Sequence, residues 1–536
     1  MKRIGIILIF VFSIIVNVYF GFQKAGFHED EYYTYFSSNR TMGLYQPDRQ
    51  WQDRQTILDE FVVKPGEGFR FGLVRLVQSW DVHPPFYYYI FHTACSIVPG
   101  VFTKWTGIIT NLLAFALCFW ILYLILERLR VSAGMQAAAL LFYGVNPQTI
   151  SCNMLIRMYA WLSLFVALCA YLHVRMVQEE EKEISERKFF IGHMLPIMIV
   201  SYFGFLTQYF YLFFFVAIGV SYSAYVVFWK KNLKRGILYV SSCAVSLLLA
   251  VISYPASVRH LFGGYRGSEA AGSIFDLGNT FMRLSFFADL LNDFVFGGYF
   301  YLIVILLLMM VIASYISKKV IQKSDGSRQI SQKDSFGPEY IILTLGTIGY
   351  FLLTAKAALL VGSASNRYEM PAYGLIIMIV FASFNLVFNL KTDTKNIRKI
   401  RSYTITIVFV AVVFLLIKGI NINDRVLFLY REDTEKIEYA TQNSEGVAVV
   451  MFNPATPHNV WRLTDELLEY RKVFYMDEEN LDKLTEPEIV DATRITLYVA
   501  DDDYQEEAIN NLMDSVELTN ISQLFSEDMW KTYEIY

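Results

Sequence analysis

Acidic residues gather directly behind the first apolar run of the sequence. Residues 28–34, just after that run, read His-Glu-Asp-Glu-Tyr-Tyr-Thr. Carboxylates beside lipid are costly, so they face water or line a polar cavity, where one can take a proton from a hydroxyl group. Two plainer interpretations stay open: a solvated loop start, and a helix N-terminus that favours acidic side chains. Asp30 and Glu31 are therefore candidate catalytic carboxylates.

Four further groups of polar and aromatic residues stand at or near the ends of apolar segments. Each alone is also what a membrane-surface anchor looks like, since tyrosine favours the interface and two prolines give a rigid helix start. The groups are His-Pro-Pro-Phe-Tyr-Tyr-Tyr at 83–89, Arg-Met-Tyr-Ala-Trp at 157–161, Leu-Thr-Gln-Tyr-Phe at 206–210 and Arg-Tyr-Glu-Met-Pro at 367–371.

One lysine lies inside an apolar run. Lys356 stands in Leu-Leu-Thr-Ala-Lys-Ala-Ala-Leu-Leu at 352–360. A charge there predicts a functional site, although the side chain can also reach the headgroups about one turn away. His83 also has a plain structural interpretation, in which it caps the helix that begins at the two prolines.

The elements that must position these residues are membrane helices. Of 536 residues, 55% are hydrophobic and 18% are charged, against about 25% charged residues in soluble proteins. Apolar runs long enough to cross a bilayer recur up to residue 420. The first, which follows Lys2 and Arg3, is expected to be retained as a span because it lacks a clear signal-peptide cleavage site. Eleven spans are expected, near 4–22, 105–126, 134–150, 157–176, 189–205, 208–229, 236–254, 299–317, 339–360, 371–390 and 402–420.

Positive charges predict the orientation of these spans, because short cytoplasmic loops are enriched in Lys and Arg. With a cytoplasmic N-terminus and eleven spans, all five basic clusters fall on the cytoplasmic side, provided that the short apolar segment 84–99 is re-entrant or interfacial. The outer face then receives residues 23–104, 255–298, 361–370 and the tail. The clusters are 127–130, 175–188, 230–235, Lys318 and Lys319 with Lys323, and 391–401.

The tail, residues 421–536, has a different composition from the rest. It carries 26 acidic and 9 basic residues, a net charge of −17, which leaves +13 for residues 1–420. Its β-rich runs alternate with helix-like stretches, which predicts a small α/β domain. It lacks a nucleotide-binding glycine loop, a metal-binding cluster and cysteine. The expected strands are 447–452, 472–476, 495–500 and 530–536, and the expected helices are 434–441, 460–470 and 505–513.

Taken in order, the five motifs resemble those of the GT-C glycosyltransferases in the protein O-mannosyltransferase and aminoarabinose transferase superfamily, glycosyltransferase family 39. That family carries an Asp-Glu pair after the first span, then His-Pro-Pro-Leu-Tyr-Tyr, Ala-Arg-Met-Tyr, Thr-His-Tyr-Phe and Arg-Tyr-x-x-Pro. The resemblance covers residues 1–390. Here Gln208 replaces the histidine of the fourth motif, Ile156 replaces the alanine of the third, and Lys104 stands near a common arginine.

The resemblance implies a GT-C transmembrane glycosyltransferase domain, expected in residues 1–420. The tail, residues 421–536, falls outside the resemblance, and its acidic charge and the number of spans predict an extracytoplasmic α/β domain. The resemblance also implies a polyprenyl-phosphate sugar as donor. In an inverting transfer, Asp30 would be the base, and Glu31 would orient the acceptor, hold a divalent cation, or be the base itself. The acceptor stays open among a lipid, a glycan and a protein; membrane lipids are expected partners and nucleic acid is not.

The leaving phosphate gains negative charge and needs cations at the outer face. Its expected ligands are Arg157, Lys356, Arg367, Tyr368, His83 and Lys104, while Tyr88, Tyr159 and Tyr209 would line the acceptor site or cavity. No metal site and no certain cofactor are indicated. The alternative is a membrane transporter, flippase or non-catalytic assembly protein for cell-envelope polysaccharide or lipid-linked sugars. A transporter should show inverted repeats and broken midplane helices, which the sequence does not display.

Overall fold

The computed structural model describes residues 2–40, 47–180, 185–310, 312, 337–388, 395–477, 484, 486–502, 505–516 and 518–536. The chain forms two compact units. Unit 1 contains Met1–Gly21, Asp81–Tyr87 and Gly107–Leu427, and unit 2 contains Phe22–Trp80, Tyr88–Thr106 and Phe428–Tyr536. Unit 2 thus combines the tail with most of the segment that follows the first span.

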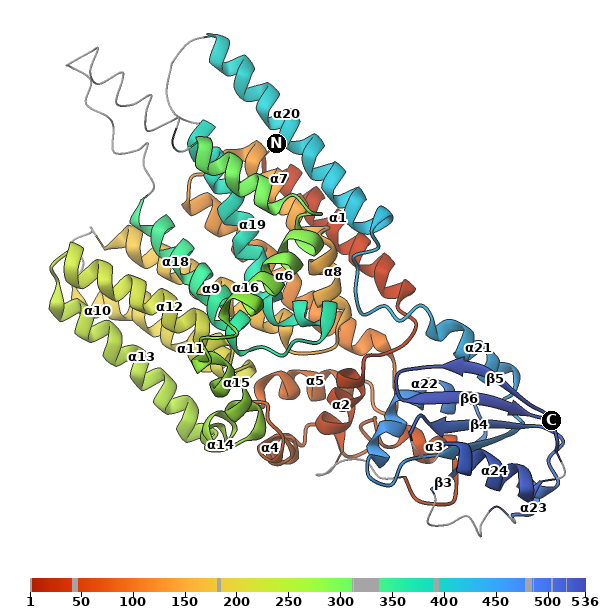
Figure 1. Ribbon diagram of the computed structural model, residues 1–536. Coiled ribbons are helices and arrows are strands. Elements are labelled where there is room, and N and C mark those ends of the chain that lie inside the picture. The colour runs from red at the N-terminus through yellow and green to blue at the C-terminus, as the bar shows by residue number, and fades with distance from the viewer. Residues whose placement is uncertain are drawn as a thin grey trace, which may run out of the picture. The chain divides into compact units, whose positions relative to one another are not determined.

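Unit 1 is helical (Figure 1). Its helices are built from the apolar runs of the sequence, and η marks a short 3₁₀ or π turn. They are α1 (Lys2–Gln23), α6 (Lys104–Arg128), α7 (Ala133–Gly144), α8 (Pro147–Met154), α9 (Tyr159–Glu179), α10 (Glu186–Phe189), η1 (Phe190–Met194), α11 (Leu195–Thr207), α12 (Tyr211–Ala224), η2 (Tyr225–Trp229), α13 (Leu233–Ser253), α14 (Ala256–Phe262), α15 (Tyr265–Phe275), α16 (Thr280–Leu290), η3 (Leu291–Val295), α18 (Pro338–Ala357), η5 (Gly362–Ser365), α19 (Asn366–Phe388), α20 (Lys395–Ile417) and η6 (Lys418–Ile422).

Among the described residues, nine helices are long and apolar enough to cross a membrane. A tenth span arises if the bent pair Thr280–Val295 and Phe300–Met310, which meet at 94°, is counted as one. The chain is a multi-pass membrane protein, as the sequence predicts. The remaining predicted span, 134–150, is divided into α7 and α8 because Asn146 caps α8 and Pro147 begins it. Part of the run 299–317 and the cluster Lys318, Lys319 and Lys323 lie outside the described residues.

Small residues let two of these helices approach closely. A Cβ atom on Gly346 of α18 would lie 2.8 Å from Ile218 of α12, and one on Gly349 would lie 2.4 Å from Ala217. Association of transmembrane helices is stabilised mainly by van der Waals contact, and glycine allows the two helices to come close enough to make it. The backbone of α18 at Gly346 and Gly349 therefore packs directly on Ala217 and Ile218 of α12.

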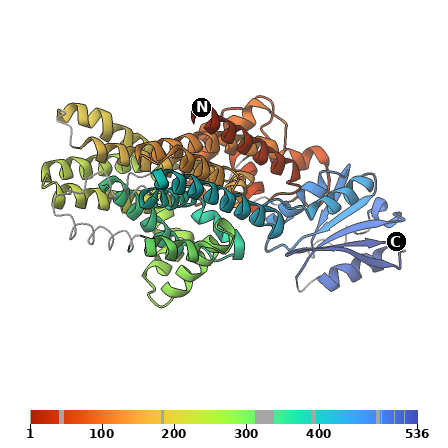
Figure 2. The same ribbon diagram turned by 90° about the horizontal axis from the view of Figure 1, so that it is seen from above.

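Unit 2 contains a six-stranded mixed sheet in the order β1-β3-β2-β4-β6-β5, whose strands lie side by side in both views (Figures 1 and 2). β2 pairs in parallel with β3 and β4, and the remaining pairs are antiparallel. The strands are β1 (Trp51–Asp53), β2 (Val447–Met451), β3 (Lys472–Met476), β4 (Ile495–Ala500), β5 (Ile521–Ser526) and β6 (Trp530–Ile535). The four predicted strands are confirmed, and β1 and β5 are additions.

Helices cover both faces of this sheet. Alternate residues of β2 point to opposite faces, so Ala448 and Val450 enter one core while Val449 and Met451 enter the other. The helices of unit 2 are α2 (Glu29–Asn39), α3 (Arg54–Leu58), α4 (Phe71–Trp80), α5 (Phe86–Ile97), α21 (Asp433–Gln442), η7 (Pro457–Leu463), α22 (Thr464–Leu467), α23 (Pro487–Val490) and α24 (Gln505–Ser515). The predicted α/β domain is therefore present, with β1 contributed by the first long loop.

The compact units divide at Leu427 and Phe428, near the predicted boundary at residue 421, and unit 2 also takes in residues 22–80 and 88–106. Trp461 of the tail packs on Tyr33 and Phe36 of α2, with ring centroids 5.2 and 4.9 Å apart. Buried aromatic contacts of this kind hold two segments together. The tail and the first long loop therefore share one core.

The segment 84–99 contains α5, which has 12 residues. At 1.5 Å per residue such a helix is about 18 Å long, well short of a hydrocarbon core of about 30 Å. Its length is that of the non-crossing helix that the sequence predicts.

Candidate active site

The predicted site residues fall in both units. Unit 2 holds Asp30, Glu31, Tyr88 and Lys104, and unit 1 holds His83, Arg157, Tyr159, Tyr209, Lys356, Arg367 and Tyr368. Each group is described by itself.

The two predicted carboxylates stand in the first turn of α2. His28 is the residue before this helix; its Nδ1 accepts a hydrogen bond from the Asp30 amide at 3.0 Å, and its own amide donates to the Glu31 carboxylate at 2.5 Å. This reciprocal pair is a capping box, which satisfies amides that have no partner within the helix. The acids thus begin a helix, as one of the plainer interpretations of the sequence holds.

Glu31 is held in a buried ion pair. Its Oε2 lies 2.9 Å from Nζ of Lys24, and both side chains are fully buried. Lys24 also donates to the carbonyl of Phe428 at 2.8 Å, and Lys104 donates to the carbonyl of Lys24. A carboxylate that neutralises a buried ammonium and caps a helix already has two structural tasks. This geometry disfavours Glu31 as the proton acceptor.

Asp30 has a more open position. Its side chain is 31% exposed and its Oδ2 lies 3.7 Å from Nδ1 of His28. A general base has to reach a proton on another molecule, which requires this kind of access. Of the two predicted carboxylates, Asp30 is therefore the better placed for chemistry.

A third carboxylate, which the sequence analysis missed, contacts the same helix. The hydroxyl of Tyr32 donates to Asp465 of α22 at 2.8 Å. Burial, together with the nearby Asp433 carboxylate, raises the pKa of Asp465 to about 7 although Tyr32 donates to it. Arg462, three residues earlier, pairs with Glu29 at 2.6 Å. No sequence pattern connects residues more than 400 positions apart.

The remaining predicted residues of unit 2 have structural surroundings. Tyr88 is fully buried, so it belongs to the core of the unit. The Lys104 ammonium donates a hydrogen bond to the carbonyl of Lys24. Within the part of the chain that the structure describes, no three His, Cys, Asp or Glu side chains are arranged to hold a metal ion.

In unit 1 the structure assembles a polar chain from Asp81, His83 and Arg157. Nδ1 of His83 lies 2.9 Å from the Asp81 carboxylate, and Nε2 lies 3.2 Å from the Arg157 guanidinium. The tautomer that satisfies both bonds donates from Nδ1 and accepts at Nε2. Burial opposes ionisation of Asp81, but its interactions with His83 and the charge of Arg157 lower its pKa overall. Asp81 thus orients the imidazole that contacts the predicted phosphate ligand Arg157.

Tyr209 lies beside a second histidine. Its hydroxyl is 2.9 Å from Nδ1 of His260, and the rings of His260 and Tyr254 are 5.8 Å apart. Tyr254 in turn donates to the carbonyl of His83 at 3.5 Å. The structure therefore brings Tyr209 and His83 into one neighbourhood. Asp81, Tyr254 and His260 were missed; only the Asp-x-His spacing at 81–83 offered a signal.

Arg367, Tyr368 and Tyr159 form an aromatic and cationic group at the start of α19. The Arg367 guanidinium lies 5.2 Å from the centre of the Tyr368 ring and donates to its hydroxyl at 3.3 Å. The Tyr159 ring stands edge-on to Tyr368 at 6.0 Å. Arg367 and Arg157 are each less than a tenth exposed. Buried guanidinium groups are suited to planar, bidentate recognition of phosphate.

Lys356 anchors a loop. Its ammonium donates to the Asp276 carbonyl at 2.6 Å, to Thr280 Oγ1 at 3.0 Å and to the side chain of Asn279. This arrangement accounts for a lysine in an apolar helix without invoking the headgroups. In this conformation its donors are directed at residues 276–280.

The fold can be compared with solved structures. The crystal structure of ArnT from Cupriavidus metallidurans bound to undecaprenyl phosphate superposes with a TM-score of 0.51 at 11% identity, covering 99% of this chain and 97% of that one. The chain has the GT-C fold. This confirms the fold that the five motifs suggested, since ArnT is a GT-C glycosyltransferase. The apo form of the same ArnT gives a TM-score of 0.46 at 11% identity, over 100% and 98% of the two chains.

Archaeal oligosaccharyltransferase AglB from Archaeoglobus fulgidus, in complex with an inhibitory peptide and a dolichol-phosphate, is also similar. It has a TM-score of 0.40 at 10% identity, over 96% of this chain and 71% of AglB. No protein-family model and no curated protein matches the sequence. The GT-C likeness is therefore one of fold.

Proposed function

We propose that this protein is a membrane glycosyltransferase that moves a sugar from a polyprenyl-phosphate donor to an acceptor hydroxyl on the outer face of the membrane. The observation that carries the proposal is the end-to-end likeness to ArnT, a GT-C glycosyltransferase whose structure holds undecaprenyl phosphate. The polar chain of Asp81, His83 and Arg157 adds chemistry that suits a lipid phosphate.

The transfer proceeds with inversion. The acceptor oxygen forms a bond to the anomeric carbon, and the bond from that carbon to the phosphate oxygen breaks, so the polyprenyl phosphate leaves with the electron pair. Asp30 takes the proton of the acceptor hydroxyl. Its partial exposure supports this role, while the ion pair with Lys24 gives Glu31 a structural one.

Arg157 and Arg367 neutralise the charge that grows on the leaving phosphate. Tyr368 orients Arg367, and His83, itself oriented by Asp81, orients Arg157. Lys356 acts indirectly by fastening residues 276–280. Tyr159 and Tyr209 supply aromatic surface for the acceptor or cavity. The sugar and the acceptor, whether lipid, glycan or protein, are outside this assignment.

The protein lies in the cell membrane with its N-terminus in the cytoplasm and unit 2 outside. The acidic tail and the basic clusters of the membrane part support this orientation.

The test separates transfer from transport. Purified full-length protein is incubated in detergent with a panel of polyprenyl-phosphate sugars and candidate acceptors, and the release of polyprenyl phosphate is measured. A transferase releases it in proportion to the glycosylated acceptor. A protein that binds these lipids without cleaving any of them, yet moves them across vesicle membranes, would be a flippase and would refute the proposal.

A further inference from the structure

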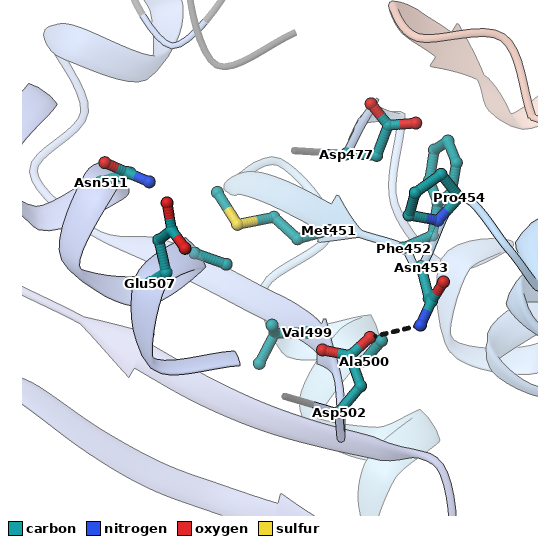
Figure 3. A pocket seen from close by; sticks show the side chains of 11 residues that line it. Met451, Phe452, Asn453, Pro454, Asp477, Val499, Ala500, Asp502, Glu507 and Asn511 are labelled. Atoms are coloured by element: carbon teal, nitrogen blue, oxygen red, sulfur yellow. Dashed lines mark hydrogen bonds between the residues drawn. The ribbon is translucent and has the colours of Figure 1, made fainter. Parts of the chain in front are cut away.

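A hollow opens in unit 2 at the carboxyl ends of β2 and β4 (Figure 3). β2 pairs with β3 on one side and with β4 on the other. The connection from β2 to β3 therefore runs towards one edge of the sheet, and the connection from β3 to β4 crosses back to the opposite side of β2. Open α/β sheets bind ligands at such reversals, because the connecting segments part there. The hollow holds about 510 Å³ of empty space, including its open mouth.

Polar side chains surround this space. Figure 3 shows Glu507 and Asn511 of α24 on one side and the hydrogen-bonded pair of Asn453 and Asp502, 2.8 Å apart, on the other. Asp477 completes the polar set after β3. The apolar part of the lining is made by Met451, Phe452, Pro454, Val499, Ala500 and Ala508.

This chemistry is wrong for an anion. The carboxylates of Asp502 and Glu507 repel phosphate, and neither Lys nor Arg is among the described residues that line the hollow. Arg49, the nearby cation, is already bound to Asp477, with Nε and a terminal nitrogen 2.6 and 2.5 Å from Oδ2. The segment after β2 reads Phe-Asn-Pro, and proline has no amide hydrogen to offer a phosphate. The described lining therefore favours a ligand without a phosphate group, despite the topology.

We infer that the hollow binds a neutral sugar or an amino sugar. Carboxylates and carboxamides bond to adjacent hydroxyl groups, and carboxylates also pair with an ammonium group. Met451, Phe452 and Val499 offer apolar surface for the C–H face of a pyranose ring. This saccharide site is separate from the residues assigned to transfer, and it stands whether or not the chain transfers sugar.

The experiment measures saccharide binding to the purified full-length protein in a detergent without a sugar headgroup. Saturation-transfer NMR is run with glucosamine, N-acetylglucosamine, mannose and galactose, and with glucuronate and glucose 1-phosphate as anionic probes. At least one of the first four should bind and the anionic probes should not. Glu507→Gln should weaken glucosamine about tenfold relative to wild type, since it replaces a charge-assisted hydrogen bond by a weaker neutral one.

Two further variants make the result specific. Glu506→Gln changes an exposed neighbour on α24 that does not line the hollow, and it should bind like wild type. Ala508→Phe fills the hollow and should abolish binding while the melting temperature stays within a few degrees. The inference is overturned if none of the four sugars binds, or if the anionic probes bind as tightly as the four sugars. It is also overturned if Glu507→Gln and Ala508→Phe both bind glucosamine like wild type.

Discussion

The ammonium of Lys24 and the carboxylate of Glu31 lie 2.9 Å apart, and neither side chain is exposed. Removing one partner of such a pair leaves a buried charge without compensation, which costs about 3–5 kcal/mol. Glu31→Gln should therefore lower the melting temperature strongly, although glutamine can still cap α2. Adding Lys24→Met should restore part of the loss. Glu29→Gln, which removes a half-exposed partner of Arg462, should cost less than about 1 kcal/mol; equal melting temperatures for the two single variants would argue against this reading.

Asp30→Asn tests the proposed base. The carboxamide has nearly the same size but cannot accept the proton, so turnover should fall by at least about 10²-fold while donor affinity and melting temperature are kept. Turnover and donor binding are measured in detergent, with Glu29→Gln as the neighbouring control. If Asp30→Asn is fully active and a folded Glu31→Gln is not, the base is Glu31.

Arg367→Ala tests the stabilisation of the leaving phosphate. Loss of one charge-stabilising group should cost on the order of 2–4 kcal/mol of transition-state stabilisation. Arg367→Lys should recover only part of the rate, because lysine cannot make a bidentate contact. Arg175→Ala, which removes a guanidinium 3.7 Å from Glu179, serves as the matched control and should leave kcat/KM unchanged. Normal turnover in Arg367→Ala would remove this residue from the site.

Asp465 gives unit 2 a pH-dependent stability. Its pKa is about 7 in the folded protein and about 3.9 in an unfolded chain. Between these values the folded state holds the extra proton, so this group lowers stability as pH rises from about 4 to about 7. Asp465→Asn should flatten the fall in melting temperature over that range and be more stable than wild type at pH 8. Asp514→Asn, at an exposed position, should follow wild type; parallel curves for all three proteins would contradict the assignment.

The orientation is tested by labelling. A cysteine at Ser444, in the acidic tail, should react with a membrane-impermeant maleimide on intact cells, and one at Ser185, in a predicted cytoplasmic loop, should react only after permeabilisation. The unmodified protein is the control, since four of its five cysteines are buried and Cys243 is partly so. The reverse pattern would invert the proposed orientation.

Hydropathy predicted most of the membrane helices, because a run of about 20 apolar residues is by itself enough to identify a helix that crosses the bilayer. It failed at 134–150, where Asn146 and Pro147 end one helix and begin another, a local effect that a hydropathy window averages away. β1 has only three residues, Trp51–Asp53, and its pairing with Phe474 depends on the tertiary fold. Nothing within the three residues Trp-Gln-Asp indicates such a strand.

The candidate site was predictable where spacing carried information. Residues 28–31 contain the capping pattern, and Asp81 stands two positions before His83. The buried partners could not be predicted in this way. Lys24 reads as an ordinary charge at a span end, and Asp465 reads as one of many acids in the tail, because long-range packing alone decides which charges are desolvated.

The pairing of β1 with β3 constrains when the protein can finish folding. Arg49 and Asp477 are 428 residues apart, so at about 5–20 residues per second the ribosome needs roughly 20 to 90 s between them. Throughout that interval β1 has been synthesised, but β3, the strand with which it pairs, has not. Lys24 and α2 lack the partners that later bury them, which leaves an early window for proteolysis or chaperone binding. A nascent chain arrested before residue 428 would keep the segment behind the first helix in its immature state.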